Sequence, residues 1–285
     1  MDFKKVLLPT DFSRPAMQLL DCLDEFKFLG LEEVILVHVI DERAKGAAKV
    51  YRGLEMELLE AQKISIENMG LKAKIMVPVA IPNLEIARIG EQEQVSLILI
   101  PSHGQGFIKN IYLGSTTNDV VRVSSVPVLV EKYIDIDKDT CSIRCLNKFQ
   151  KVLLPLDFSI YSRMLLDELS GLAHLVEEVI LLTVIEGALD KDELMQTLAN
   201  RNELLDLARR ELEQLGLKVK TMVGRGAASD AIISAAAQQD VTLIMLAKRG
   251  AGLIKELLLG STAYEVARRS QVPTLIIPVA KYRQN

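Results

Sequence analysis

Residues 5–13 read KVLLPTDFS, and residues 151–159 read KVLLPLDFS. The offset of 151 − 5 = 146 residues also relates Gly70 to Gly216. This period is far longer than the ~20–50 residues of a solenoid repeat. It therefore indicates that a whole domain is duplicated.

The length agrees with this interpretation, because 285 residues correspond to roughly two domains at about 150 residues each. The boundary is expected in the polar segment after the first half, which lacks sustained periodicity. We expect a first domain at 1–133, a linker at 134–148 and a second domain at 149–285.

Each half alternates apolar runs of strand length with helical periodicity. In the first half, strands are expected at 6–8, 34–40, 72–79, 97–100 and 126–130, and helices at about 14–28, 47–69, 83–93 and 116–124. Continuous apolar runs are typical of parallel strands buried on both faces. The alternation predicts an α/β fold with two tandem doubly wound, Rossmann-like domains, each a parallel sheet of five strands with helices on both faces. The charged segment 190–214 is interpreted as a solvated helix with ion pairs.

Composition narrows the class of partner. The 34 Lys and Arg against 38 Asp and Glu give a net charge of −4, which disfavours a general nucleic-acid binder. No apolar run approaches the ~18 residues that span a bilayer, so no membrane partner is expected. The N-terminus enters a strand without a signal-peptide pattern, and a cytoplasmic location is expected.

The three cysteines are too few for a disulfide framework. Cys22 lies on a helical apolar pattern and is expected in the core. Cys141 and Cys145 lie in the expected linker and are interpreted as incidental thiols. A local redox pair and an intersubunit metal site stay open as alternatives.

Ligands of open α/β sheets bind beyond the carboxyl ends of the strands. Two kinds of segment reach that edge. The loop after the first strand reads Pro9-Thr10-Asp11 in one half and Pro155-Leu156-Asp157 in the other. The loop after the fourth strand reads PSHGQG at 101–106 and continues to LGST at 113–116, and its copy reads AKRGAG at 247–252 and continues to LGST at 259–262.

The chemistry of the second loop suits a phosphate. Glycines let the backbone approach an anion and adopt positive φ, and a helix that opens at Gly114-Ser115-Thr116 offers free N–H groups. Thr116 with Asp119, and Thr262 with Glu265, have the spacing of a capping box. Asp11 and Asp157 can accept hydrogen bonds from ribose hydroxyls or a base edge, which a purely structural turn would not require.

These motifs resemble the universal stress protein family in tandem form, over nearly all of both halves. The family's nucleotide motif is Gly, two residues, Gly, nine residues, then Gly-Ser or Gly-Thr, and the second and third elements are present in both halves. The resemblance implies an adenine-nucleotide pocket in each half. The predicted site residues of the first are Pro9, Thr10, Asp11, Val39, Pro101, His103, Gly104, Gly114, Ser115 and Thr116. Those of the second are Pro155, Asp157, Val184, Ala247, Arg249, Gly250, Gly260, Ser261 and Thr262.

Both halves depart from the motif at its first glycine, where Pro101 and Ala247 stand, and Leu156 replaces a threonine. Lys248 and Arg249 can hold phosphates, so the second site is expected to favour longer phosphate chains than the first. The ligand is expected to be ATP or AMP, with Mg²⁺ as an option beside ATP. His103 is interpreted as a loop or phosphate-contact residue rather than a catalytic one.

Without a Walker-type loop or a phosphoryl clamp, the sequence favours a nucleotide-binding sensor or regulatory module with little or no turnover. A slow ATPase or nucleotide hydrolase, and a scaffold with degenerate pockets that acts through protein contacts, stay open. The resemblance also implies that the apolar closing strands at 126–130 and 274–279 pair in an intramolecular pseudo-dimer. A further homodimer and an unknown regulatory protein partner are compatible with it.

Overall fold

The computed structural model describes residues 2–43, 52–104, 113–134, 142–143, 147–250 and 259–278. The chain divides into two compact units, Asp2–Leu146 and Asn147–Asn285, called the N-terminal and C-terminal units below. Predictions for Cys141, Cys145, Val279, the helix start at 47–51 and the loop positions 105–112 and 251–258 fall outside the described residues.

The N-terminal unit contains a sheet of parallel strands in the order β4-β2-β1-β6-β7. Their bounds are β1 Lys5–Pro9, β2 Glu33–Val37, β4 Lys72–Met76, β6 Leu97–Pro101 and β7 Val128–Glu131. The order reverses between β1 and β6, which is the switch point where ligands of such sheets bind.

The C-terminal unit repeats this arrangement in the order β12-β11-β10-β13-β14. The bounds are β10 Lys151–Pro155, β11 Glu178–Ile185, β12 Lys218–Arg225, β13 Leu243–Ala247 and β14 Thr274–Ile277. Residues Val152, Leu153 and Leu154 of the central strand are fully buried, as expected for a strand covered on both faces.

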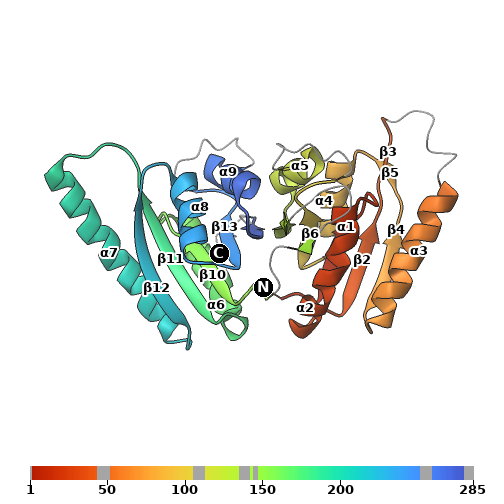
Figure 1. Ribbon diagram of the computed structural model, residues 1–285, viewed down its shortest axis with the longest axis horizontal. Helices are drawn as coiled ribbons and strands as arrows, with labels where there is room; N and C mark the ends of the chain where they lie inside the picture. The colour runs from red at the N-terminus through yellow and green to blue at the C-terminus, as the bar shows by residue number, and fades with distance from the viewer. Residues whose placement is uncertain are drawn as a thin grey trace. The chain divides into compact units, whose positions relative to one another are not determined.

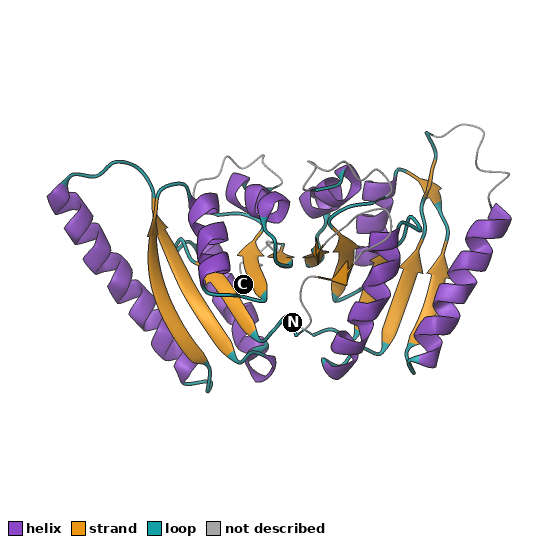
Figure 2. Cartoon of the chain, viewed as in Figure 1, coloured by secondary structure: helices purple, strands orange, loops and turns teal. Residues whose placement is uncertain are grey.

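Helices cover both faces of each sheet (Figures 1 and 2). In the N-terminal unit they are α1 Arg14–Gln18, η1 Leu19–Cys22, α2 Leu23–Phe28, α3 Arg52–Asn68, α4 Pro82–Gln92 and α5 Ser115–Val123. In the C-terminal unit they are α6 Ile160–Gly171, η3 Ala173–Leu175, α7 Lys191–Glu213, α8 Ala228–Gln238 and α9 Ser261–Arg269. The predicted fold class, two tandem Rossmann-like domains, is confirmed.

The N-terminal unit differs from the prediction in three elements. The helix expected at 14–28 is interrupted by the 3₁₀ turn η1, and the strands expected at 34–40 and 72–79 are each split. Their outer parts, β3 Ile40–Asp41 and β5 Val79–Ala80, form a small separate sheet. Pro78 explains the split, because it has no N–H to donate to a ladder. At the 146-residue offset its counterpart is Gly224, and there β12 runs without a break to Arg225.

The segment after β7 contains a short antiparallel pair, β8 Tyr133–Ile134 with β9 Ser142–Ile143. It lies in the region for which a linker is expected. The Tyr133 hydroxyl donates to the carbonyl of Pro15 at 2.6 Å, so the start of this segment is attached to its own unit. Cys22 is fully buried, as predicted, with its Sγ 3.3 Å from Oε2 of Glu131.

Candidate functional site

The loop after the first strand of each unit is held by its aspartate. Oδ1 of Asp157 accepts hydrogen bonds from the Ser159 N–H at 3.0 Å and the Ser162 hydroxyl at 2.5 Å. Oδ1 of Asp11 accepts from the Ser13 N–H, also at 3.0 Å. This is the Asx turn, in which the side chain bonds to the backbone two residues on. The expectation that a structural turn would not require these aspartates is therefore wrong, because one oxygen of each closes the turn.

The residue inside this turn has unusual backbone geometry in both units. Phe12 has a φ of 61° and Phe158 a φ of 60°, a region that bulky residues rarely occupy. The following serine caps the next helix: the Ser13 side chain accepts from the Ala16 N–H, and the Ser159 side chain from Ser162. The same strained turn thus precedes a capped helix twice, which fixes the aspartate at the carboxyl edge of each sheet.

The second oxygen of each aspartate faces a glycine of the other loop. A Cβ at residue 250 would lie 2.8 Å from Oδ2 of Asp157, and one at residue 104 would lie 2.5 Å from Oδ2 of Asp11. Both distances are shorter than the contacts that Cβ atoms make in proteins, so a side chain at either position would displace the carboxylate or the loop. Neither Gly104 nor Gly250 has a positive φ, so the predicted conformational reason for these glycines is wrong. Glycine is required here because the aspartate occupies the space that a side chain would need.

The helices α5 and α9 begin without a side-chain cap. Their N-cap residues are Gly114 and Gly260, with φ of −64° and −68°, and neither makes a side-chain capping bond. The predicted capping boxes at Thr116 and Thr262 are therefore wrong, because the N-cap positions lie two residues earlier, at Gly114 and Gly260. No N-cap side chain competes for the first-turn N–H groups, and the helix dipole favours an anion beside them.

In the C-terminal unit these features surround one cavity of about 500 Å³. It lies at the carboxyl edge of the sheet, between α6 and α7 on one side and α8 and α9 on the other. All the site residues predicted for this unit line it: Pro155, Asp157, Val184, Ala247, Arg249, Gly250, Gly260, Ser261 and Thr262. The structure brings them together, and their role as nucleotide ligands stays a prediction.

Other lining residues were not among the predicted site residues. These are Leu156, Ser162, Leu165, Leu182, Glu186, Arg201, Ala228, Ile232, Leu246, Lys248 and Ala263. The apolar members give the cavity a wall suited to a flat, apolar group. Two of the charged members are cations, Arg201 from α7 and Lys248 from the loop after β13, and the third, Glu186, is a carboxylate.

Arg201 reaches the cavity from α7. Its guanidinium carbon lies 5.3 Å from the centroid of the Phe158 ring, a cation–π arrangement. Its Nη1 donates to the carbonyl of Asp157 at 3.5 Å. This residue lies in the segment 190–214, for which a solvated helix with ion pairs is expected. Its position four residues before the fully buried Leu205 places it on the inner face of α7, which is the signal that could have found it.

Lys248 is the titratable cation of the cavity. Burial, and secondarily the neighbouring Arg249 charge, lower the pKa of its ammonium to about 8 from an ordinary 10.5. Only 8 % of the residue is exposed. An anion bound beside the ammonium would raise this pKa again, because an opposite charge favours the protonated form.

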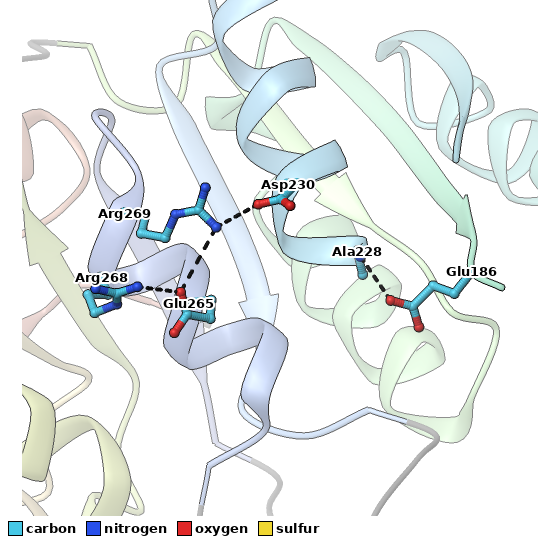
Figure 3. Close-up of polar contacts among 6 residues, drawn as sticks. All are labelled: Glu186, Ala228, Asp230, Glu265, Arg268 and Arg269. Carbon is cyan, nitrogen blue, oxygen red and sulfur yellow. Dashed lines mark hydrogen bonds and ion pairs between the residues drawn. The ribbon is translucent and has the colours of Figure 1, made fainter. Parts of the chain in front are cut away.

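Glu186 positions the α8 wall of the cavity. Its Oε1 accepts from the Ala228 N–H at 2.9 Å, at a helix start that lacks a side-chain cap of its own (Figure 3). On the same face, Arg269 of α9 contacts Asp230 of α8 at 2.6 Å and Glu265 at 4.0 Å (Figure 3). Of these contacts, the one between Arg269 and Asp230 joins α9 to α8 beside the cavity.

In the N-terminal unit the predicted residues gather at the equivalent edge. Pro9 and Pro101 end β1 and β6, Thr10 and Asp11 follow β1, and Val39 lies between β2 and β3. The Thr117 hydroxyl of α5 donates to the Pro101 carbonyl at 2.7 Å. This bond attaches the start of α5, with Gly114, Ser115 and Thr116, to the end of β6.

Two histidines lie at this edge. Nδ1 of His38 is 2.9 Å from the Thr10 carbonyl, and its ring packs against Phe12 at 4.6 Å. Its Nε2 is 3.7 Å from Oε1 of Glu55. His103 has its Nδ1 2.9 Å from the hydroxyl of the buried Ser102. Ser102 and His103 occupy the positions that Lys248 and Arg249 have in the C-terminal unit.

The described residues contain no group of three or more His, Cys, Asp or Glu side chains arranged to hold a metal ion. Within the same ranges, no helix is both long enough and apolar enough to cross a membrane.

The chain belongs to the universal stress protein family, whose sequence model matches it twice, at residues 2–132 and 148–278. A universal stress protein of Methanocaldococcus jannaschii is 40% identical over 154 residues, which cover 46% of this chain and 95% of the relative. One from Synechocystis is 30% identical over 133 residues, 45% of this chain and 85% of the relative. Among solved structures, a universal stress protein from Archaeoglobus fulgidus DSM 4304 has a TM-score of 0.74 at 27% identity, covering 97% of each chain. The chain thus spans two copies of the family's domain.

Proposed function

We propose that this universal stress protein binds an adenine nucleotide, ATP or AMP, at each of its two sites and serves as a sensor or regulatory module with little or no turnover. One observation carries the proposal: a single cavity in the C-terminal unit is lined by the Asp157 carboxylate, the uncapped start of α9 and the cations Lys248 and Arg249. The family membership supports it, as does the recurrence of the aspartate–glycine approach in the N-terminal unit.

The proposed orientation follows from the chemistry of the cavity walls. Phosphates carry the negative charge and are stabilised at the first-turn N–H groups of α9 and beside Ser261. The ribose hydroxyls donate to the carboxylate of Asp157, which lines the cavity. The base packs on the apolar wall that includes Val184 and Ile232. Mg²⁺ would enter with ATP, held by its phosphates.

The two sites are expected to differ in the number of phosphates they favour. Lys248 and Arg249 line the C-terminal cavity, whereas Ser102 and His103 occupy the same positions in the N-terminal unit. Cations strengthen phosphate binding through charge-assisted hydrogen bonds. ATP is therefore favoured over AMP more strongly at the C-terminal site.

Calorimetric titrations with ATP and AMP test this proposal. Gly104→Val places a side chain against Asp11 and is expected to block the N-terminal site, so that only the C-terminal site binds. Gly250→Val is expected to block the C-terminal site, so that only the N-terminal site binds. The chain with Gly104→Val is expected to prefer ATP over AMP by at least about tenfold. Exchanging Lys248→Ser and Arg249→His in that background is expected to remove most of this preference. Equal losses of ATP and AMP binding in both glycine variants would contradict the difference between the sites.

Turnover is tested separately. A sensor releases no phosphate beyond a trace when ATP is incubated with the chain, whereas a hydrolase releases phosphate continuously at a rate proportional to protein concentration. Continuous phosphate release by the wild-type chain that is lost in the Gly104→Val/Gly250→Val double variant would show that these sites hydrolyse ATP. That result would overturn the proposed lack of turnover.

A further inference from the structure

Arg201 lines the C-terminal cavity without a carboxylate partner. Within the described part of the chain, no Asp or Glu lies within ion-pairing distance of its guanidinium, and its contact with Asp157 is to the backbone carbonyl, not to the carboxylate. Arg209, about two turns further along α7, is by contrast bridged by Asp206 at 3.2 Å and Glu213 at 2.9 Å. The charge of Arg201 is thus available to a ligand in the cavity.

The charge at this position is reversed between the two units. The helices α3 and α7 correspond at the 146-residue offset, since Leu59 and Leu205 are both fully buried. At the same offset, Arg201 corresponds to Glu55. A charge that the duplicated fold accepts with either sign is not required by the fold, so Arg201 is available for a role specific to the C-terminal cavity.

Arg201 lies on a different side of the cavity from the Lys248–Arg249 pair. Helix α7 packs on β11 and β12, and Arg201 contacts the loop after β10 through Phe158 and Asp157. Lys248 and Arg249 follow β13, on the far side of β10 from β11. The guanidinium of Arg201 thus lies beside the loop after the central strand β10, whereas Lys248 and Arg249 belong to the loop after the neighbouring strand β13.

We propose that Arg201 forms a second anion subsite in the C-terminal cavity, which binds a phosphate on the ribose of an adenine nucleotide that also carries a 5′-phosphate. The inference rests on the proposed function, which places the ribose at Asp157 and the 5′-phosphates at the start of α9. The planar guanidinium matches a phosphate group with two parallel N–H donors. Stacking on Phe158 orients that plane before the ligand arrives, which reduces the entropy lost on binding.

The test compares ligands that differ only in the ribose phosphate. The full chain with Gly104→Val, stripped of nucleotide, is titrated with AMP, adenosine 3′,5′-bisphosphate and adenosine 2′,5′-bisphosphate. One of the bisphosphates is expected to bind at least about tenfold tighter than AMP, as expected for one added charge-assisted contact. The better bisphosphate identifies which hydroxyl carries the phosphate.

Three variants in the same background assign the preference to Arg201. Arg201→Gln is expected to abolish the preference for the bisphosphate over AMP, measured as the ratio of the two affinities, and Arg201→Lys is expected to keep part of this preference. Arg209→Gln, on the same helix outside the cavity, is expected to keep all of it. The inference is overturned if neither bisphosphate binds tighter than AMP, or if the preference survives Arg201→Gln. Absence of binding by ATP, AMP and both bisphosphates alike would instead contradict the proposed function.

Discussion

Oδ2 of Asp157 lies 2.8 Å from the point that a Cβ at Gly250 would occupy. The carboxylate cannot easily move away, because its Oδ1 accepts from the Ser159 and Ser162 side chains. The loop after β10 and the loop after β13 are therefore matched in shape at the carboxyl edge of the sheet. The same relationship holds for Asp11 and Gly104, so it does not depend on the residues that differ between the two units.

This close approach predicts the effect of the smallest substitution. Gly250→Ala is expected to push the Asp157 carboxylate or the loop aside, to lower ATP affinity at the C-terminal site about tenfold, and to cost about 1–3 kcal/mol of unfolding free energy through overpacking. Calorimetric titration and denaturant unfolding measure the two effects. Gly53→Ala is the matched control, because nothing lies within 4 Å of its Cβ position. Unchanged affinity in Gly250→Ala would show that the approach has no role in binding.

Lys248 makes binding depend on pH. Its pKa of about 8 means that the ammonium loses its proton as the pH rises through that value, and with it the attraction to a phosphate. ATP affinity at the C-terminal site is therefore expected to fall between pH 7 and pH 9. Lys248→Met is expected to flatten this profile. Arg249→Gln is expected to shift the fall in affinity to higher pH, because the Arg249 charge contributes to the lowered pKa of Lys248. A profile that Lys248→Met leaves unchanged would assign the titration to another group.

The same group has a predicted effect on the stability of the unliganded chain. The pKa of Lys248 is about 8 in the folded state and 10.5 in the unfolded reference, so the unfolded chain binds more protons between these values. The free energy of unfolding is expected to gain a contribution that increases as the pH rises from about 8 to 10.5. Comparing denaturant unfolding of the wild type with Lys248→Met isolates this contribution, which must be absent from the variant.

Thr117 is expected to stabilise the N-terminal unit through its bond to the Pro101 carbonyl. Thr117→Val keeps the shape of a side chain that is 4 % exposed but removes the donor at 2.7 Å. We expect a loss of about 1–2 kcal/mol of unfolding free energy. Ala263, the counterpart at the 146-residue offset, has no hydroxyl, so the C-terminal unit lacks the equivalent bond. Stability retained in Thr117→Val would mean that the carbonyl finds another donor.

The bridge between Arg163 of α6 and Glu211 of α7 is expected to contribute much less. Its two bonds of 2.7 and 2.6 Å are well formed, but 53% of the Arg163 side chain is exposed, and water screens such pairs. Arg163→Gln is expected to cost less than about 1 kcal/mol, and the difference is expected to shrink at high salt. A larger, salt-independent loss in denaturant unfolding would show that the pair acts through packing instead.

The order of strands and helices could be predicted because it depends on local patterns of apolar and polar residues along the sequence. The run KVLLP is apolar enough to form the buried central strand in both units. Pro78 carried a signal for the split of the neighbouring strand, since a residue without an N–H interrupts a ladder. The interruption of the helix at 14–28 by η1 has no such signal in the sequence.

The sequence predicts most of the residues that line the C-terminal cavity from their motifs, but in some cases for the wrong physical reason. Sequence spacing placed Gly104 and Gly250 at the site, yet only the three-dimensional approach of Asp11 and Asp157 explains why they are glycines. Arg201 was missed, because its role depends on the contact of α7 with a loop more than 40 residues earlier in the chain. Such a contact depends on tertiary packing, which local periodicity does not report.

We expect both aspartate–glycine sites to bind adenine nucleotide, and equilibrium dialysis of the stripped full chain against ATP measures this. Saturable binding is expected in the wild-type chain, reduced by Gly104→Val and by Gly250→Val, and lost in the double variant, in which a cooperative unfolding transition shows that the chain is still folded. Absence of saturable binding by the wild-type chain, or binding that survives in the double variant, would contradict it.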